Sequence, residues 1–309
     1  MRKLFVILIV ILAMISSSNA QNNSSSKSGK LTIASCQFPI SSTISENYEW
    51  IKKQIIEASL KKADIVHFAE CALSGYPGVD LETLEGFDWQ LLYEKTDSVL
   101  SLAKQLDVWI LLGSIHRLSE GVKPHNSLYV INPEGKITDR YDKRFSTSGD
   151  LEHFSPGDHF VNFDLNGVNC GLLICYDIRF PELFREYSKL NTQVLFHSFY
   201  NARQKKGSIH PVIMPITSQA RAATNYFYVS LTNSSATESW PCHFITPDGL
   251  IQNKLATNVP GVLISEVDLS NKYYDASRKF RQNALNGILN SGETVKDIHS
   301  GNRTEIIKQ

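Results

Sequence analysis

Short apolar runs along the chain alternate with longer segments whose apolar side chains recur at helical spacing. Runs rich in β-branched and aromatic residues predict strands at residues 30–38, 64–70 and 108–116. The segments between them, residues 45–63 and 89–106, place apolar residues every three or four positions, which predicts helices. This order of strands and helices is typical of an α/β fold.

The pattern changes in the middle of the chain, where strands follow one another directly. Residues 126–143 read as two strands joined at Asn-Pro-Glu-Gly, and residues 159–177 as two strands joined at Asn166 and Gly167, a strong hairpin signal. Further helices are predicted at residues 181–190 and 211–224, and further strands at residues 192–199, 226–233, 243–255 (a hairpin) and 261–269. Hairpins within a strand–helix alternation favour mixed β-sheets with helices on their outer faces. The strands are continuously apolar, so we expect both faces of each sheet to be buried.

The first twenty residues differ from everything after them. Arg2 and Lys3 precede an unbroken apolar run over residues 4–15, and small polar residues follow up to Ala20. This is the pattern of a secretory signal peptide. The run is shorter than the roughly 18 apolar residues of a membrane span, so we expect a cleaved signal at residues 1–20 rather than an anchor. The protein is then exported, either to the periplasm or to the medium, without a stable membrane span.

The remaining chain is expected to form one domain at residues 31–285. A flexible polar leader at residues 21–30 precedes it, and a polar C-terminal tail at residues 286–309 follows it. The whole chain has 309 residues and a formal net charge of zero. These values fit a globular protein with a sizeable core and argue against a nucleic-acid partner, which usually requires a basic face.

The cysteines carry information because an exported protein meets an oxidising compartment. There are five, Cys36, Cys71, Cys170, Cys175 and Cys242, and an odd number leaves at least one unpaired in a monomer. Their spacing shows no CxxC pair and no Cys/His cluster, so no structural zinc site is predicted. Core packing accounts for the thiols that lie in apolar stretches.

Three predicted strands end on a chemically reactive residue: Glu70, Lys143 and Cys175. Ligands of α/β sheets bind beyond the carboxyl ends of the strands, so we expect these residues to converge. A thiol is weakly ionised at neutral pH and needs a base or a lowered pKa. Glu70 can accept its proton if burial raises the Glu70 pKa. Lys143 would favour the thiolate and then stabilise an oxyanion, together with the amide N–H of Tyr176. Taken singly, Glu70 or Lys143 is more often an ordinary solvated strand end, and Cys175 is more often a buried core thiol.

The segments around these residues resemble those of the nitrilase, or carbon–nitrogen hydrolase, superfamily. The matching motifs are Glu70 before Ser-Gly-Tyr (residues 74–76), the Tyr-Asp-Lys step (141–143), "CYDIRFPE" (175–182), "RAATN" (221–225) and the Pro-Asp-Gly turn (247–249). They occur in the family's order, and the resemblance spans residues 31–269.

This resemblance implies a four-layer α-β-β-α sandwich of two mixed β-sheets. It implies an amidase in which Cys175 attacks the carbonyl of a small carboxamide or N-carbamoyl compound and forms a thioester. Glu70 is then the general base, Lys143 and Tyr176 hold the oxyanion, and Glu152 matches an assisting glutamate of the family. No metal or cofactor is implied. The expected partners are a small amide substrate and further copies of the chain, in a homodimer or larger homo-oligomer.

Several alternatives stay open at this stage. Arg179 could pair with a substrate carboxylate through its planar fork, or form an internal salt bridge with Asp177, Glu182 or Glu186. "CYDIRFPE" is closer to the amidase branches, including those acting on dicarboxylate monoamides, than to nitrile hydrolases. A Cys–His hydrolase would leave Lys143 without a role. A non-catalytic scaffold would predict the loss of a triad residue, and a lipoprotein-type acyltransferase would require several membrane spans.

Overall fold

The structure, a computed structural model, describes residues 28–201, 204–301 and 303. The expected signal peptide at residues 1–20 lies outside the described residues, as does most of the leader. No helix within the described part is long and apolar enough to cross a membrane.

The domain is built on two six-stranded sheets. The first contains β1 (Lys30–Gln37), β2 (Ile65–His67), β3 (Trp109–His116), β4 (His125–Ile131), β5 (Ile137–Asp142) and β12 (Gly261–Asp268). The second contains β6 (Asn162–Leu165), β7 (Val168–Ile174), β8 (Val194–Ser198), β9 (Tyr228–Thr232), β10 (His243–Ile245) and β11 (Ile251–Lys254). Their orders are β12-β1-β2-β3-β4-β5 and β11-β10-β9-β8-β7-β6. Both sheets are mixed, because β1, β2 and β3 are parallel, as are β7, β8 and β9, while the remaining pairs are antiparallel.

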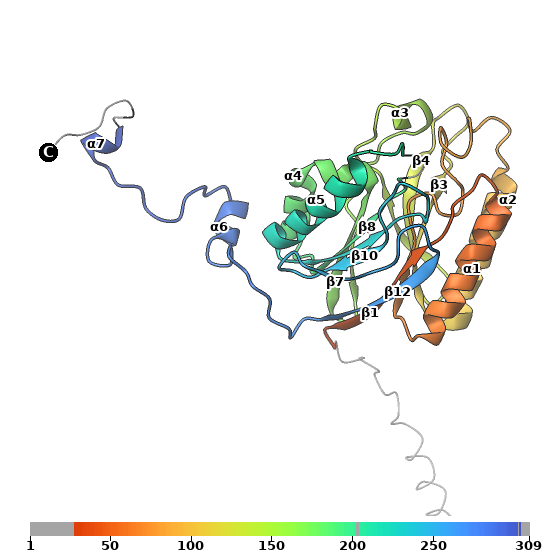
Figure 1. Cartoon of the computed structure of the whole chain (residues 1–309), viewed down its shortest axis with the longest axis horizontal. Helices are drawn as coiled ribbons and strands as arrows, with labels where there is room; N and C mark the ends of the chain where they lie inside the picture. The colour runs from red at the N-terminus through yellow and green to blue at the C-terminus, as the bar shows by residue number, and fades with distance from the viewer. Residues whose placement is uncertain (1–27, 202–203, 302, 304–309) are drawn as a thin grey trace, which may run out of the picture.

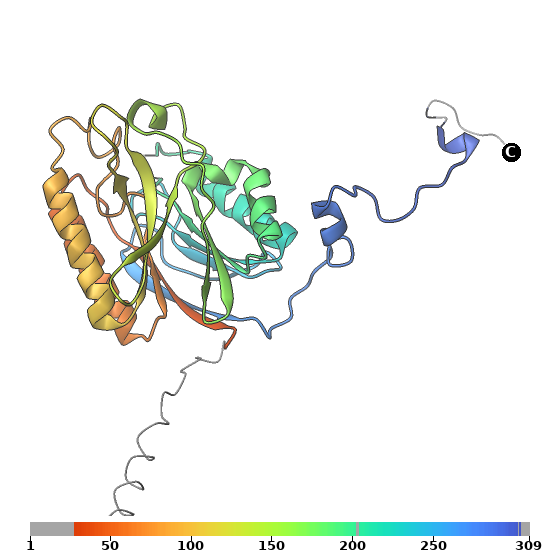
Figure 2. The ribbon, with the colours of Figure 1, turned by 180° about the vertical axis from the view of Figure 1, so that it is seen from behind.

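Helices cover the outer face of each sheet, which confirms the expected four-layer sandwich (Figures 1 and 2). The first sheet is covered by α1 (Ile44–Leu60) and α2 (Trp89–Leu106), and the second by α4 (Pro181–Lys189) and α5 (His210–Asn225). The short helix α3 (Asp150–His153) and the 3-10 helix η1 (Cys175–Arg179) lie in connections. Beyond β12 the chain leaves the sandwich as an extended arm with α6 (Arg281–Leu285) and α7 (Ile298–Gly301) (Figure 1).

The helix α2 begins and ends where the sequence predicts. The Asp88 carboxylate accepts a hydrogen bond from the Leu91 N–H at 2.9 Å, which caps the first turn. Asp107 ends the helix in the left-handed conformation with a φ of 51°. Between these caps, Leu92, Val99 and Ala103 bury one face against the first sheet.

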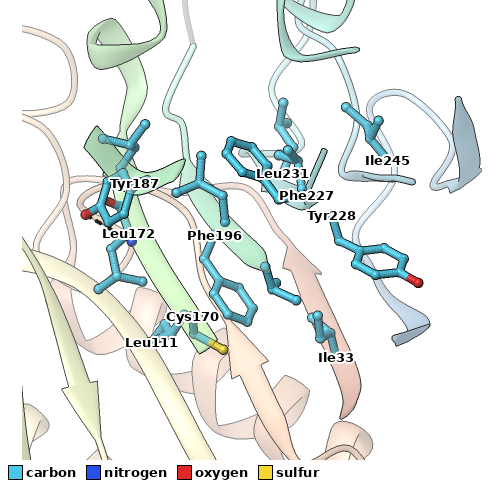
Figure 3. Packing of buried hydrophobic residues seen from close by; sticks show 14 of the residues in the cluster. Ile33, Leu111, Cys170, Leu172, Tyr187, Phe196, Phe227, Tyr228, Leu231 and Ile245 are labelled. Carbon is cyan, nitrogen blue, oxygen red and sulfur yellow. Dashed lines mark hydrogen bonds between the residues drawn. The ribbon is translucent and has the colours of Figure 1, made fainter. Parts of the chain in front are cut away.

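The strands are apolar on both faces because each sheet is packed on two sides. Within β2, Ile65 belongs to the core between the two sheets, whereas its neighbour Val66 packs beneath the helices. Figure 3 shows the inter-sheet core, where Ile33 and Leu111 of the first sheet face Phe196 of the second. Burial of this kind stabilises the fold by roughly 1.5–3 kcal/mol for each large apolar side chain.

A small group of polar side chains interrupts this core and joins the sheets to each other. The imidazole of His67 on β2 bonds to Ser230 on β9 and to Ser198 on β8, both at 2.9 Å. Ser35 on β1 also bonds to Ser230, at 2.8 Å. We call Ser35, His67, Ser198 and Ser230 the inter-sheet polar cluster. Burial lowers the pKa of His67 well below its usual value, so the ring is neutral. Unpaired buried polar groups are costly, so the cluster favours one alignment of the two sheets.

Candidate active site

The three reactive strand ends meet at one edge of the sandwich. β2 and β5 run in the same direction within the first sheet. Lys143 therefore follows β5 at the same edge at which Glu70 follows β2. Cys175 follows β7 of the second sheet and shares a cavity with Lys143. The Lys143 Nζ lies 2.8 Å from the Glu70 Oε1, and both side chains are buried.

Glu70 lies in a tight turn rather than at the end of an extended strand. The chain leaves β2 after His67 and crosses β3 at Gly113, where a Cβ atom would lie 2.0 Å from the carbonyl oxygen of Ala69. Only glycine permits so close an approach of two backbones. The sequence prediction of a strand through residue 70 is therefore too long by three residues, and this crossing is the physical reason.

Hydrogen bonds hold the Glu70 carboxylate on both of its oxygens. Oε1 accepts from the Asn126 side chain at 2.7 Å as well as from Lys143, and Oε2 accepts from the backbone N–H of Tyr200 at 2.9 Å. The Glu70 N–H in turn donates to the carbonyl of Phe199 at 3.2 Å. Asn126 comes from β4 and Tyr200 follows β8, so both sheets fix this carboxylate.

The Lys143 ammonium also contacts a second carboxylate, that of Asp150 in α3. Its Nζ lies 2.8 Å from the Asp150 Oδ2 and 3.3 Å from the hydroxyl of Tyr76. The Tyr76 hydroxyl donates to the other Asp150 oxygen at 2.5 Å, and the Thr147 N–H donates to Oδ2 at 2.9 Å. The buried cluster thus holds one cation between two carboxylates.

Burial and the mutual attraction of these groups shift their pKa values in defined directions. Burial raises the pKa of Glu70, and the Lys143 charge opposes this effect only in part. Burial alone would lower the pKa of Lys143, but the Glu70 charge and other neighbours outweigh it and raise that pKa well above its usual value. For Asp150 the raising effect of burial is outweighed by Lys143, so its pKa is lowered. Lys143 therefore stays protonated, while Glu70 is the carboxylate that accepts a proton more readily.

Cys175 starts η1 in a left-handed conformation with a φ of 45°, which is uncommon for a residue with a Cβ atom. Burial raises the pKa of its thiol well above the usual value, and the Glu70 charge raises it further. The positive charge of Lys143 lowers the thiol pKa but does not compensate. Lys143 thus acts in the direction that favours the thiolate, while burial and Glu70 keep the thiol protonated, so transfer of the thiol proton accompanies attack.

A buried aspartate fixes the turn that carries the thiol. The Asp177 Oδ2 accepts from the Ile174 N–H at 3.0 Å and from the Tyr141 hydroxyl at 2.8 Å. Its Oδ1 accepts from the Phe145 N–H at 2.9 Å. Burial raises the pKa of Asp177 to about 6, although these donors oppose the effect. Asp177 therefore joins the segment after β5 to the segment after β7.

Cys175 and Lys143 open into a cavity of about 410 Å³. Tyr176 also lines this cavity. Glu152 also lines it, but its side chain is exposed, and the carboxylate that contacts Lys143 belongs to Asp150 instead. Arg179 is exposed and is not among the lining residues. A contact between its guanidinium and a substrate carboxylate therefore stays a prediction.

The other residues that contact Glu70 and Lys143 were not predicted from the sequence, because few features of the sequence point to them. Asp150 lies two residues before Glu152, so a second acidic residue in the same segment was the available signal. Tyr76 lies inside the Ser-Gly-Tyr motif, but Asn126 stands in an ordinary strand. No cluster of three or more His, Cys, Asp or Glu side chains suited to a metal ion occurs within the described residues.

Comparison with known proteins identifies the family of the chain. The Carbon-nitrogen hydrolase family model matches residues 32–273. The omega-amidase NIT2 of Xenopus tropicalis is 30% identical over 222 residues, which cover 68% of this chain and 76% of that protein. The 2-oxoglutaramate amidase of Bacillus subtilis (strain 168) is 35% identical over 177 residues, covering 55% of this chain and 64% of that protein.

Solved structures show the same fold. A mutant of the amidase from Nesterenkonia sp. AN1 carries the acetamide moiety of fluoroacetamide on its active site cysteine, and it is similar with a TM-score of 0.70 and 18% identity, covering 84% of this chain and 98% of that one. An alanine mutant of the Nesterenkonia AN1 amidase gives a TM-score of 0.69 with 17% identity, covering 84% and 97%. The family model, the relatives and the fold agree with the motifs around the buried cluster, and the chain belongs to the carbon–nitrogen hydrolase family, as an amidase of the nitrilase superfamily.

Proposed function

We propose that this protein hydrolyses the carboxamide of a small molecule through a thioester on Cys175 and releases ammonia. The observation that carries the proposal is the buried pair of Glu70 and Lys143, 2.8 Å apart, beside a thiol that opens into a cavity. Acyl transfer to a thiol requires a base that takes the thiol proton and a fixed positive charge that stabilises the oxyanion. Glu70 and Lys143 can fill these two roles.

The reaction proceeds in two halves. In the first, Glu70 takes the thiol proton as sulfur bonds to the carbonyl carbon, and the oxyanion is held by the Lys143 ammonium and the Tyr176 N–H. The C–N bond then breaks, and Glu70 gives its proton to the nitrogen, which departs as ammonia. In the second half, Glu70 takes a proton from water, the hydroxide adds to the thioester, and the C–S bond breaks. The acid leaves, and Cys175 regains its proton.

Dicarboxylate monoamides are the proposed substrates, because the matching relatives are named omega-amidases and a 2-oxoglutaramate amidase. The cavity volume of about 410 Å³ suits a ligand of this size. N-carbamoyl compounds and nitriles are the competing substrates. A non-catalytic scaffold is the competing function, but it predicts the loss of a triad residue, and Glu70, Lys143 and Cys175 are all present in the sequence.

The deciding experiment measures ammonia release from succinamate, simple carboxamides, N-carbamoyl compounds and nitriles. Wild type and Cys175→Ala are compared, and we expect release from the monoamides by wild type alone. Equal release by both proteins would refute the role of Cys175. No release from any compound would favour the scaffold, and release from nitriles alone would identify a nitrile hydrolase.

We also propose that the protein is exported, on the strength of the apolar run at residues 4–15 and the small residues before Ala20. Mass spectrometry of the mature N-terminus tests this, and a mature chain that begins at or near Met1 would refute it.

A homo-oligomer is proposed from the outer face of α5. Ile209, Val212 and Ile216 lie at helical spacing along this face, and they are 65%, 62% and 53% exposed. A row of exposed apolar side chains is typical of a surface that another protein covers. Val212→Glu should shift the mass measured by light scattering towards the monomer, and an unchanged mass would place the interface elsewhere.

A further inference from the structure

A buried histidine on β8 contacts the backbone of the nucleophile. The Nε2 of His197 lies 3.2 Å from the carbonyl oxygen of Cys175. A carbonyl oxygen only accepts, so Nε2 carries the hydrogen and donates it. Burial lowers the pKa of His197 to about 3, which keeps the ring neutral at physiological pH. Nδ1 then carries no hydrogen, and it has no partner within the described residues. Among the residues that the structure describes, the ring therefore has one hydrogen bond, and that bond reaches Cys175.

The contacted carbonyl belongs to the same peptide group as the Tyr176 N–H. A peptide group is planar and trans, so its C=O and N–H point in opposite directions. A donor that fixes the Cys175 oxygen on one side therefore also fixes the direction of the Tyr176 N–H on the other. In the proposed reaction this N–H is one of the two oxyanion donors.

The conformation of Cys175 explains why the peptide group needs such support. A left-handed φ of 45° is strained for a residue with a Cβ atom, and surrounding contacts must maintain it. Asp177 fixes the peptide group between Leu173 and Ile174, one residue further upstream, by accepting from the Ile174 N–H. His197 contacts the peptide after Cys175. The two contacts hold the nucleophile from both sides.

The chain around His197 also orients the base. The His197 ring stacks on Phe199 with centroids 4.2 Å apart. The Phe199 carbonyl accepts the Glu70 N–H, and the next residue, Tyr200, donates its N–H to the Glu70 carboxylate. The end of β8 therefore contacts the backbone of the nucleophile and the side chain of the base within four residues.

We propose that His197 is a positioning residue that fixes the peptide group between Cys175 and Tyr176, and so directs the Tyr176 N–H at the oxyanion. The proposal rests on the proposed amidase function. It predicts a specific defect, in which oxyanion stabilisation weakens while the thiol itself remains reactive.

The test uses three measurements on wild type, His197→Phe and His197→Gln. The first is kcat/KM for ammonia release. The second is the affinity for butanal, whose carbonyl carbon bonds to the Cys175 sulfur while the thiol proton ends on the oxygen. The third is the rate at which methyl methanethiosulfonate converts the Cys175 thiol to a mixed disulfide with loss of sulfinate, which involves no oxyanion. Peptide mass spectrometry follows formation of the mixed disulfide at Cys175. The affinity for butanal is taken from the degree to which butanal slows this modification.

His197→Phe should lower kcat/KM by a factor of about 10 to 100, since loss of one oxyanion donor costs up to about 10²–10³. It should lower butanal affinity by a smaller factor, because the oxygen of the adduct is a neutral hydroxyl. The disulfide rate should change less than about twofold. His197→Gln keeps a donor and should recover part of the loss. If the Phe variant does not fold, His197→Met tests the same loss of the donor.

His243 provides a matched control. It is also buried, with burial lowering its pKa to about 4, its Nδ1 bonds to the backbone carbonyl of Pro241, and its Nε2 has no partner in the described chain. It lies on β10, and its hydrogen bond reaches Pro241 rather than Cys175. His243→Phe should leave all three measurements unchanged.

Unchanged butanal affinity in His197→Phe would overturn the proposal, as would a disulfide rate that falls as far as kcat/KM. Butanal protection does not require turnover. If wild type hydrolyses no amide, the proposed function fails, while the affinity difference still decides the role of His197.

Discussion

The two sheets contribute opposite kinds of groups to one site. The first sheet supplies the charges, with Glu70 after β2 and Lys143 after β5. The second supplies groups that are neutral at rest, the Cys175 thiol after β7 and the His197 ring on β8. Burial explains both, because a buried charge must be paired, as in the first sheet, and a buried group without a partner charge stays uncharged, as in the second.

The difference shows which half depends on charge and which on geometry. In the charged half one ammonium, that of Lys143, compensates two carboxylates, so removing it leaves buried charges uncompensated. In the neutral half, the Cys175 thiol and the His197 ring carry no charge. There the direction of the peptide group after Cys175 and the position of the thiol determine the reaction rate. Mutations in the two halves should therefore differ in their effects on stability and on rate.

The largest expected effect comes from removing the base without changing its shape. Glu70→Gln should lower kcat by about 10²–10⁴, because the thiol then has no group to take its proton. Lys143 retains Asp150 as a partner, so the melting temperature should change little. Ammonia release and thermal unfolding measure the two quantities. More than a tenth of the wild-type rate would show that another group serves as the base.

Lys143→Met tests the claim that the charged half is interdependent. It leaves Glu70 and Asp150 buried without a cation, and we expect a loss of about 3–5 kcal/mol in the free energy of unfolding at neutral pH. Without the cation, the pKa values of both carboxylates rise above their unfolded values. The loss should therefore shrink as the pH falls and they become protonated. Urea unfolding at pH 7 and pH 5 measures it, and an equal loss at both would contradict the explanation.

Asp177 should give a pH-dependent effect on stability. Its folded pKa is about 6, above its usual value of 3.8, so its contribution is fully present below pH 4 and is lost as the pH rises through 6. A shift of about two units corresponds to roughly 3 kcal/mol. The difference in unfolding free energy between wild type and Asp177→Asn should move by up to this amount between pH 4 and pH 7. Other titrating groups are common to both proteins, so a constant difference would contradict the raised pKa.

A smaller effect distinguishes the two acidic residues of one segment. Asp150→Asn weakens the contact with Lys143 and should reduce kcat by about 10- to 100-fold, within the range of a single electrostatic contact in an active site. Glu152→Gln is the matched control, and because its side chain is exposed we expect less than about a twofold change. A larger loss for Glu152→Gln than for Asp150→Asn would reverse the assignment.

The smallest effect is expected at Arg179, which lies outside the cavity. Arg179→Ala should change KM for succinamate by less than about twofold, as is usual for an exposed position. A tenfold rise in KM with an unchanged kcat would show that the guanidinium reaches the substrate after all.

Periodicity and strand ends predicted most of the fold and the meeting of Glu70, Lys143 and Cys175. These signals are local, because burial on two faces requires continuous apolar strands and the carboxyl ends of parallel strands share an edge. The alternation of hairpins and helices predicted mixed sheets, and the family resemblance predicted their pairing into four layers.

The partners of these residues depended on geometry that spacing does not encode. Asp150 and Glu152 lie two positions apart on a single helical turn, where successive side chains rotate by about 100°. The two therefore point to different sides, and the motif alone did not select Asp150. Asn126 and His197 stand in buried strands where a polar residue has many structural explanations. Their contacts arise only when β4 and β8 are placed beside the site.

The inter-sheet polar cluster acquires a further meaning from the position of the site. Thiol and base belong to different layers, so any sliding of one layer over the other changes the separation of sulfur and carboxylate directly. His67 holds the layers in alignment only three residues before Glu70. The rate of turnover therefore depends on the alignment of the two layers. Conditions that let the layers slip, such as pressure, mild denaturant or a substitution at Ser230, should abolish activity while each sheet still retains its secondary structure.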